Sequence, residues 1–137
     1  TDTARTDAAL AVPGETTVLG RVFSVSLRPA SDLPPGGARA RCAPSRQVFD
    51  AARVCGALRV RTRQPGDRFR PLGMHGSRKL QDYFVDRGVP EPLRNAVPLV
   101  VADDGILWIV GHAPSADAAV TPETEQLLEV EVRDARE

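Results

Sequence analysis

The sequence predicts an α+β domain with a mixed, largely antiparallel β-sheet and one main helix. Segments in which apolar and polar residues alternate with a period of two outnumber segments with helical spacing. Turns rich in Pro, Gly and Asp separate these segments, which favours antiparallel connections. Residues 77–87 combine a capping residue, an apolar stripe at helical spacing and a following glycine, which predicts the helix.

The 137 residues, 42% hydrophobic and 26% charged, have the composition of a globular domain with a single core. No apolar run reaches the roughly 20 residues of a membrane-spanning helix, and no signal-peptide pattern opens the chain. We therefore expect a cytoplasmic protein without a membrane partner. In that compartment Cys42 and Cys55 are expected to be free thiols, and two cysteines are too few for a metal site.

Short elements alternate with loops over the first part of the chain. Residues 1–14 are rich in Ala, Thr and Asp and end in Pro-Gly, which predicts a tail or linker remnant before one domain at residues 15–137. Alternation over residues 17–27, interrupted at Gly20, indicates one or two strands. The Asp-Leu-Pro-Pro-Gly-Gly sequence within residues 31–37 is a loop.

The middle of the chain continues with short elements. Residues 38–42 and 47–49 can each form a strand, and residues 50–54 can form one helical turn. Residues 58–63 alternate apolar and basic side chains, which predicts a strand with one apolar and one basic face. The basic face carries Arg59, Arg61 and Arg63. Residues 64–67, Gln-Pro-Gly-Asp, predict a turn.

The second half has stronger patterns. Ser77 can cap the helix at residues 77–87. The buried stripe of that helix is expected to consist of Leu80, Tyr83 and Phe84. The nearly all-apolar residues 97–101 and 106–110 flank Ala-Asp-Asp-Gly and predict a hairpin buried in the core. Alternation over residues 128–132 predicts a last strand.

The charges are segregated although the formal net charge is zero. Residues 59–94 carry nine basic and four acidic residues, whereas residues 95–137 carry two basic and nine acidic ones. This distribution indicates a basic surface in the middle segment, while the acidic end forms a solvated face or offsets the basic one.

Residues 73–79 contain two glycines followed by Ser77, Arg78 and Lys79. Cations in the first turn of a helix oppose its dipole, and an anion bound there would reverse that effect, so the segment is a candidate phosphate site. The alternative is an exposed loop whose cations point into water. The segment does not match a P-loop, and one Gly-x-x-Gly without flanking helices is weak evidence for a KH domain.

The arginine-rich strand and the residues after it could follow a nucleic-acid backbone through Arg59, Arg61, Arg63, Arg68 and Arg70. The alternatives are a solvated strand face, or pairing with Glu129 and Glu131 across the sheet. We expect at least one arginine to be paired internally. Asp67 is expected to cap its turn or to hold Arg68 rather than to act as an acid or base.

No catalytic constellation is visible. His75 and His112 have no nucleophile or carboxylate at a telling spacing, and we assign them no role. Tyr83 and Trp108 lie on apolar stripes, so platforms for stacking single-stranded bases are lacking. We therefore predict no catalytic and no metal-binding residue in this chain.

Several motifs together resemble the C-terminal substrate-binding domain of bacterial tRNA(Ile)-lysidine synthetase. They are Leu-Arg-Val-Arg at 58–61, Arg-Gln-Pro-Gly-Asp-Arg-Phe-Arg-Pro-Leu-Gly-Met at 63–74, Gly-Ser-Arg-Lys-Leu-Gln-Asp-Tyr-Phe at 76–84, Val89-Pro90, Arg94, Pro98-Leu-Val100 and Ile106-Leu-Trp108 to Gly111. The likeness is dense from residue 58 to 111, and residues 13–16 and 49–50 are similar to the usual opening of that domain. A related fold occurs in the phenylalanyl-tRNA synthetase β subunit.

The resemblance implies a tRNA-binding domain that contacts the acceptor stem of tRNA(Ile). Family members use ATP and magnesium in an N-terminal catalytic domain to join lysine to the wobble cytidine. This sequence lacks the Ser-Gly-Gly-x-Asp-Ser loop of that domain, so we expect no cofactor and no activity here. The candidate RNA-binding residues are Arg61, Arg63, Arg68, Arg70, Ser77, Arg78 and Lys79.

One departure from the family pattern concerns residues 112–119, which lack the basic residues usual there. RNA contacts by that loop are therefore not expected. Two other functions stay open: a structural module that docks onto the rest of the enzyme, and a separate enzyme that binds a nucleotide phosphate at the glycine loop.

Overall fold

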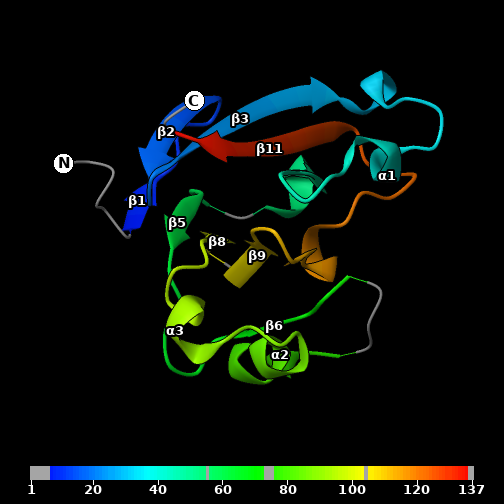
Figure 1. Ribbon diagram of the computed structural model, residues 1–137. Coiled ribbons are helices and arrows are strands. Elements are labelled where there is room, and N and C mark those ends of the chain that lie inside the picture. Colours follow the sequence, from blue (N-terminus) through cyan, green and yellow to red (C-terminus); the bar gives the residue numbers. More distant parts are fainter. Residues whose placement is uncertain (1–6, 55, 73–75, 104, 136–137) are drawn as a thin grey trace.

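The computed structural model describes residues 7–54, 56–72, 76–103 and 105–135, and two antiparallel sheets dominate it (Figure 1). The upper sheet has the order β2-β3-β11-β4 and consists of β2 (Gly14–Val18), β3 (Arg21–Pro29), β11 (Gln126–Asp134) and β4 (Arg46–Asp50). The central sheet has the order β1-β5-β8-β9-β10 and consists of β1 (Asp7–Ala9), β5 (Arg59–Arg61), β8 (Leu99–Ala102), β9 (Gly105–Ile109) and β10 (Ala113–Pro114). Every strand pair in these described segments is antiparallel, so the predicted α+β class is confirmed.

A lower layer covers the other face of the central sheet (Figure 1). It consists of the two-stranded pair β6 (Arg68–Phe69) and β7 (Arg78–Lys79) with the helices α2 (Leu80–Asp86) and α3 (Glu91–Arg94). The connections of the upper half contain α1 (Ala38–Arg41) and the short 3-10 helices η2 (Ala30–Asp32), η3 (Ala51–Arg53) and η4 (Ala116–Ala118).

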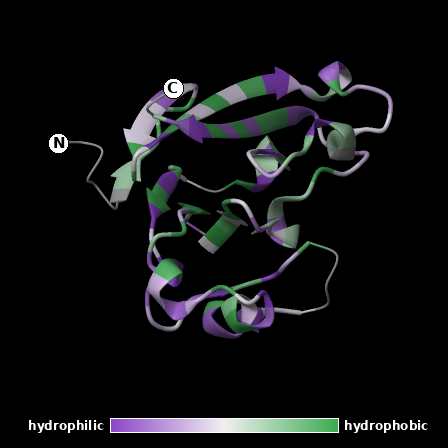
Figure 2. Cartoon of the chain, viewed as in Figure 1, coloured by the Kyte–Doolittle hydropathy of each residue, from purple (hydrophilic) through white to green (hydrophobic). Residues whose placement is uncertain are grey.

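The predicted hairpin of β8 and β9 is confirmed and is buried on both faces. Successive side chains of a strand point to opposite faces. Val100 and its partner Trp108 therefore join a core with the upper sheet, whereas Leu99 and Ile109 join a second core with α2. In Figure 2, β9 of this hairpin is mostly green, because both of its faces are buried. The strands β3 and β11 are striped, because each buries mainly one face.

The start of the chain differs from the prediction. Residues 1–6 lie outside the described part, but β1 pairs with β5, and both Ala8 and Leu10 are buried in the upper core. The burial of these two apolar side chains anchors the segment. The predicted tail therefore does not extend through residue 14.

The elements after β1 are mostly as predicted. Residues 17–27 form parts of two strands, β2 and β3, and the interruption is a two-residue hairpin turn in which Leu19 and Gly20 have φ values of 56° and 71°. The strand expected at residues 38–42 is instead α1, because its Ala-Arg-Ala-Arg sequence consists of strong helix formers. Cys42, next to it, is a free cysteine, and Cys55 lies outside the described residues.

The main helix is shorter than the predicted residues 77–87, because α2 begins at Leu80 and ends at Asp86. Its buried residues are Leu80, Tyr83 and Phe84, as predicted. Arg78 and Lys79 extend as β7 and pair with β6, and the Leu80 N–H donates to the Asp67 carbonyl at 2.9 Å. These backbone hydrogen bonds replace the expected cap, so Ser77 does not cap the helix.

Candidate nucleic-acid interface

Arg61 is held inside the fold by Asp67. Its two terminal nitrogens donate to the two carboxylate oxygens at 2.9 and 3.0 Å, and the side chains are only 17% and 12% exposed. Asp67 also accepts the Gln64 N–H at 2.7 Å and so caps its turn, as predicted, although its arginine partner is not Arg68. Arg61 is therefore an internally paired arginine, as expected for at least one residue of this group, and it braces the turn.

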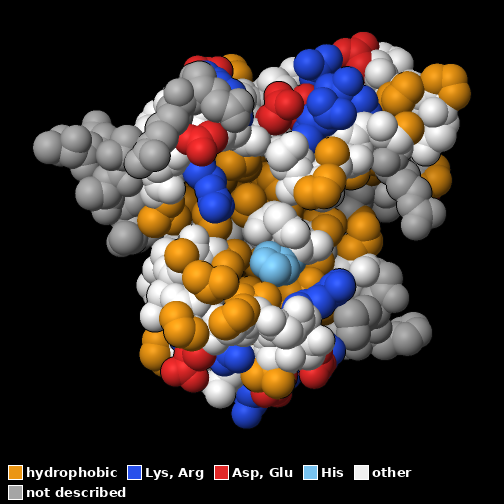
Figure 3. Space-filling model, viewed as in Figure 1, with side chains coloured by type: hydrophobic (Ala, Val, Ile, Leu, Met, Phe, Trp, Pro, Cys, Tyr) orange, Lys and Arg blue, Asp and Glu red, His pale blue; other side chains and the backbone are white. Residues whose placement is uncertain are grey.

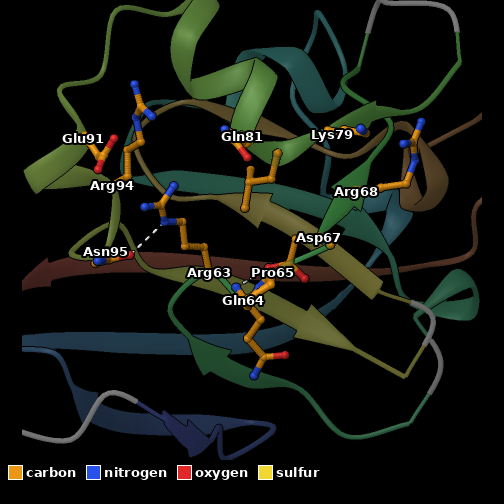
Figure 4. Close-up of a pocket in the computed structure, with 12 residues that line it drawn as sticks. Arg63, Gln64, Pro65, Asp67, Arg68, Lys79, Gln81, Glu91, Arg94 and Asn95 are labelled. Atoms are coloured by element: carbon orange, nitrogen blue, oxygen red, sulfur yellow. Dashed lines mark hydrogen bonds between the residues drawn. The ribbon is translucent and has the colours of Figure 1, made fainter.

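A hollow of about 490 Å³ lies between this turn, the start of α2 and α3. Four basic side chains line it: Arg63, Arg68, Lys79 and Arg94. We call it the basic hollow. Figure 4 shows Arg63 and Arg94 on one side of it, Arg68 and Lys79 on the other, and Gln81 between them.

Three of these four side chains, Arg63, Arg94 and Arg68, donate hydrogen bonds to neutral partners. The Arg63 Nε donates to the Asn95 Oδ1 at 2.8 Å, and the Arg94 Nε donates to the Val89 carbonyl at 2.9 Å. Arg68 donates to the Ser77 Oγ from two nitrogens at 3.3 and 3.2 Å. Among the residues that the structure describes, none of the four cations of the hollow forms an ion pair. Their charges are therefore available to an anionic ligand.

Arg68 and Lys79 also oppose each other directly in the register of β6 and β7. Like charges at directly opposite positions destabilise a strand pair. The two side chains are exposed, so water screens this repulsion only in part. A bound anion would attract both side chains and so offset their mutual repulsion.

The structure does not bring all predicted site residues together. Arg78 forms an ion pair with Asp86, and Arg70 forms one with Asp117 at 3.3 Å. The helix-terminal phosphate site is not formed as predicted, because Arg78 and Lys79 belong to a strand and Ser77 accepts from Arg68. Residues 73–75, including His75, lie outside the described residues.

The alternative in which the arginine-rich strand, β5, pairs with Glu129 and Glu131 is wrong. Both carboxylates lie on β11 in the upper sheet, where they pair with Arg41 and Arg46. The Glu129 Oε1 accepts from the Arg41 Nη2 at 2.6 Å and from its Nε at 3.1 Å. These hydrogen bonds, with the nearby negative charge, raise the pKa of the Arg41 guanidinium.

Sequence reasoning missed Arg94, Asn95 and Gln81 as residues of the site. Asn95 lies 32 positions after Arg63 and reaches it only because the chain reverses through α2 and α3. No local pattern encodes such a contact. The available signal was the short Pro90-Glu-Pro92 segment, which starts a new helix and brings Arg94 back toward Arg63, just after β5.

The buried aromatic residues are structural. Trp108 and Tyr83 are fully or almost fully buried, as the sequence predicts. The His112 ring lies edge-on to the Tyr83 and Phe84 rings, with centroids 6.5 and 6.1 Å apart. Burial, followed by the charge of Arg87, lowers the pKa of His112.

Two other features are absent from the described residues. No helix there is long and apolar enough to cross a membrane. In the same residues, no group of three or more His, Cys, Asp or Glu side chains is placed to hold a metal ion.

Residues 58–131 match the model of a family described as the TilS substrate C-terminal domain. The chain belongs to this family. The resemblance inferred from the motifs is therefore confirmed, and the match includes all the residues that line the basic hollow.

Curated relatives carry the name tRNA(Ile)-lysidine synthase. That of Symbiobacterium thermophilum is 45% identical over 104 residues, which cover 74% of this chain and 20% of the relative. That of Caldanaerobacter subterraneus is 32% identical over 126 residues, which cover 89% of this chain and 26% of the relative. The chain thus spans about a fifth to a quarter of the length of these relatives.

Solved structures support the fold. A crystal structure of a TilS C-terminal domain superposes with a TM-score of 0.75 at 28% identity and covers 93% of this chain and 97% of that one. An N-terminal fragment of the phenylalanyl-tRNA synthetase β subunit from Pyrococcus horikoshii has a TM-score of 0.55 at 17% identity, with coverages of 66% and 28%, and shares the fold alone.

Proposed function

We propose that this chain is the tRNA-binding domain of a tRNA(Ile)-lysidine synthase. Its task is to hold the acceptor stem of tRNA(Ile) while the catalytic domain of the same polypeptide acts on the distant anticodon. ATP, magnesium and lysine belong to that catalytic domain, and the enzyme works in the cytoplasm. Membership of the family and the names of the relatives support this assignment.

The observation that carries the RNA-binding part is the basic hollow, whose four cations form no ion pair within the described residues. Protein–RNA affinity depends largely on contacts between cations and phosphates, and arginines already paired with carboxylates contribute little to it. A-form RNA displays its phosphates and 2′-hydroxyl groups more openly than its base edges. Arg63, Arg68, Lys79 and Arg94 suit such a backbone, and Arg70 can join them because its ion pair is half exposed.

The chain supplies binding and not chemistry in this proposal. Its sequence contains no Ser-Gly-Gly-x-Asp-Ser loop, which the family uses for ATP. The isolated domain should therefore release no pyrophosphate from ATP and leave tRNA unmodified, even with lysine and magnesium present. Its zero net charge predicts weak binding of RNA by the domain alone, with a Kd of about 10⁻⁴ to 10⁻⁶ M at physiological salt.

The direct test is an acceptor-stem hairpin titrated with the wild-type domain and with Arg68→Ala/Lys79→Ala. We expect the double variant to bind at least about tenfold more weakly, since two phosphate contacts are lost. Its melting temperature should stay the same or rise, because the opposed charges are removed.

Arg53→Ala/Arg133→Ala is the matched control. It also removes two exposed arginines, which pair with Asp50 and Glu15 in the upper half. Equal affinity of all three proteins for the hairpin would place the RNA contacts outside the basic hollow, and no binding at low salt would instead favour a structural docking module.

A further inference from the structure

We propose that the basic hollow receives an unpaired nucleotide at the end of an RNA duplex. This inference rests on the proposed RNA-binding function and adds a subsite to it. The duplex backbone lies along the cations, and the first unpaired base enters the hollow between the turn at 64–67, α2 and α3.

The size of the hollow exceeds what a phosphate contact needs. A volume of about 490 Å³ falls within the range of small-ligand sites, of roughly 300 to 1,000 Å³. A phosphate on a duplex can be bound by cations on a flat or convex surface. A recess of this volume, in contrast, can surround a whole nucleotide.

The side chains between the cations are those that read a base edge. Gln81 and Asn95 contribute amides, which can both donate and accept hydrogen bonds, and Glu91 contributes a carboxylate that accepts from amino or hydroxyl groups. Gln81 lies between the two pairs of cations, where Figure 4 shows it facing the hollow. A site for phosphate alone has no use for a carboxylate.

Two guanidinium groups are fixed in position for stacking. The Arg63 Nε is anchored on the Asn95 Oδ1, and the Arg94 Nε is anchored on the Val89 carbonyl. Bases that are splayed out of a helix stack on arginine planes as well as on aromatic rings. This arrangement supplies a stacking surface although Tyr83 and Trp108 are buried.

A paired base would not exploit these groups. The Watson–Crick edges of a duplex are occupied, and its deep major groove does not admit side chains. The edge of an unpaired base at the end of a stem is free. The chemistry of the hollow therefore fits a single-stranded end next to a duplex.

The test compares three RNA hairpins with the same stem: one blunt, one with a short unpaired 3′ tail and one with a short unpaired 5′ tail. The wild-type domain should bind one of the tailed hairpins about tenfold more tightly than the blunt one, as expected for one stacked and hydrogen-bonded base. Equal affinity for all three would overturn the subsite but leave duplex binding intact. No binding to any of them would overturn the proposed function as well.

The variants Gln81→Ala and Asn95→Ala locate the effect. Neither changes the charge of the protein, so a purely electrostatic surface predicts unchanged affinity for every hairpin. The subsite predicts that each variant reduces the gain from the tail, measured as the ratio of the affinities for the tailed and the blunt hairpin, to about threefold or less. The control is Gln126→Ala, which removes an exposed amide from β11 and should keep the full gain. An undiminished gain in both hollow variants would contradict the proposal.

Binding of free AMP shows whether the hollow is a site for an RNA end or for a soluble nucleotide. We expect AMP to bind far more weakly than the tailed hairpin, because it lacks the neighbouring duplex phosphates. AMP that binds as tightly as the tailed hairpin would assign the hollow to a free nucleotide and overturn the proposal.

Discussion

The arginines of the upper sheet and those of the basic hollow have different partners. In the upper sheet, Arg41 and Arg46 pair with carboxylates of β11, and Figure 3 shows basic and acidic side chains next to each other there. In the basic hollow, Arg63 donates to a side-chain amide and Arg94 to a backbone carbonyl. The number of arginines therefore does not mark a binding surface. What marks it is the chemistry of their partners.

The largest expected effect concerns the core under the lower layer. Phe84 is fully buried between α2 and the central sheet, and Phe84→Ala should lower the free energy of unfolding by about 3 to 5 kcal/mol. Phe49→Ala, in the upper core, is the matched variant with a similar expected loss. Urea unfolding measures both. A loss below about 1 kcal/mol for Phe84→Ala would mean that the lower layer is not packed as described.

The second effect concerns Asp67, the carboxylate that holds Arg61 inside the fold. Asp67→Asn removes a paired charge and weakens the turn cap, and should lower the free energy of unfolding by about 3 kcal/mol. The control Asp86→Asn, which breaks the exposed pair with Arg78, should cost less than about 1 kcal/mol. Equal losses in denaturant unfolding would contradict a structural role for the Arg61–Asp67 pair.

A third effect compares two carboxylates of β11. The side chain of Glu129 is 8% exposed and that of Glu131 is 53% exposed, although each pairs with an arginine. Glu129→Gln should therefore lower the melting temperature by several degrees, and Glu131→Gln by much less. Neither should weaken RNA binding. If Glu129→Gln binds RNA more weakly at a temperature where the variant is folded, the RNA interface would lie on the upper sheet, which contradicts the account.

The smallest effect is the titration of His112. Because burial and the charge of Arg87 lower its pKa, NMR should find that pKa below the ordinary value of about 6.5, and Arg87→Gln should raise it. The unfolded chain then takes up the proton at a higher pH than the folded domain does. This residue therefore favours folding above its ordinary pKa, and that contribution is lost as the pH falls. An unchanged pKa in Arg87→Gln would remove Arg87 as a cause.

The sequence predicted elements whose patterns reflect burial. The apolar runs of β8 and β9 and the stripe of Leu80, Tyr83 and Phe84 report contact with a core, which is why both predictions hold. Predictions based on local capping chemistry fared worse. Ser77 looked like a helix cap, but pairing of β7 with β6 satisfied the backbone instead.

The site was predictable only in part, because the fold decides which side chains its arginines contact. Arg63, Arg68 and Lys79 were recognisable as basic residues, but the carboxylate that removes Arg61 from the surface comes from the turn that follows the strand. Arg94 completes the hollow through the reversal at α3. The pairing of an arginine depends on the fold, so composition alone could not separate the available cations from the internally paired ones.

The salt dependence of RNA binding tests the central claim most directly. If the four cations of the basic hollow contact phosphates, the slope of log K against log salt should be about −3 to −4 for an acceptor-stem hairpin. Arg68→Ala/Lys79→Ala should reduce its magnitude by about two, and Arg53→Ala/Arg133→Ala should leave it unchanged. A wild-type slope near zero, or the same reduction in both variants, would contradict the account.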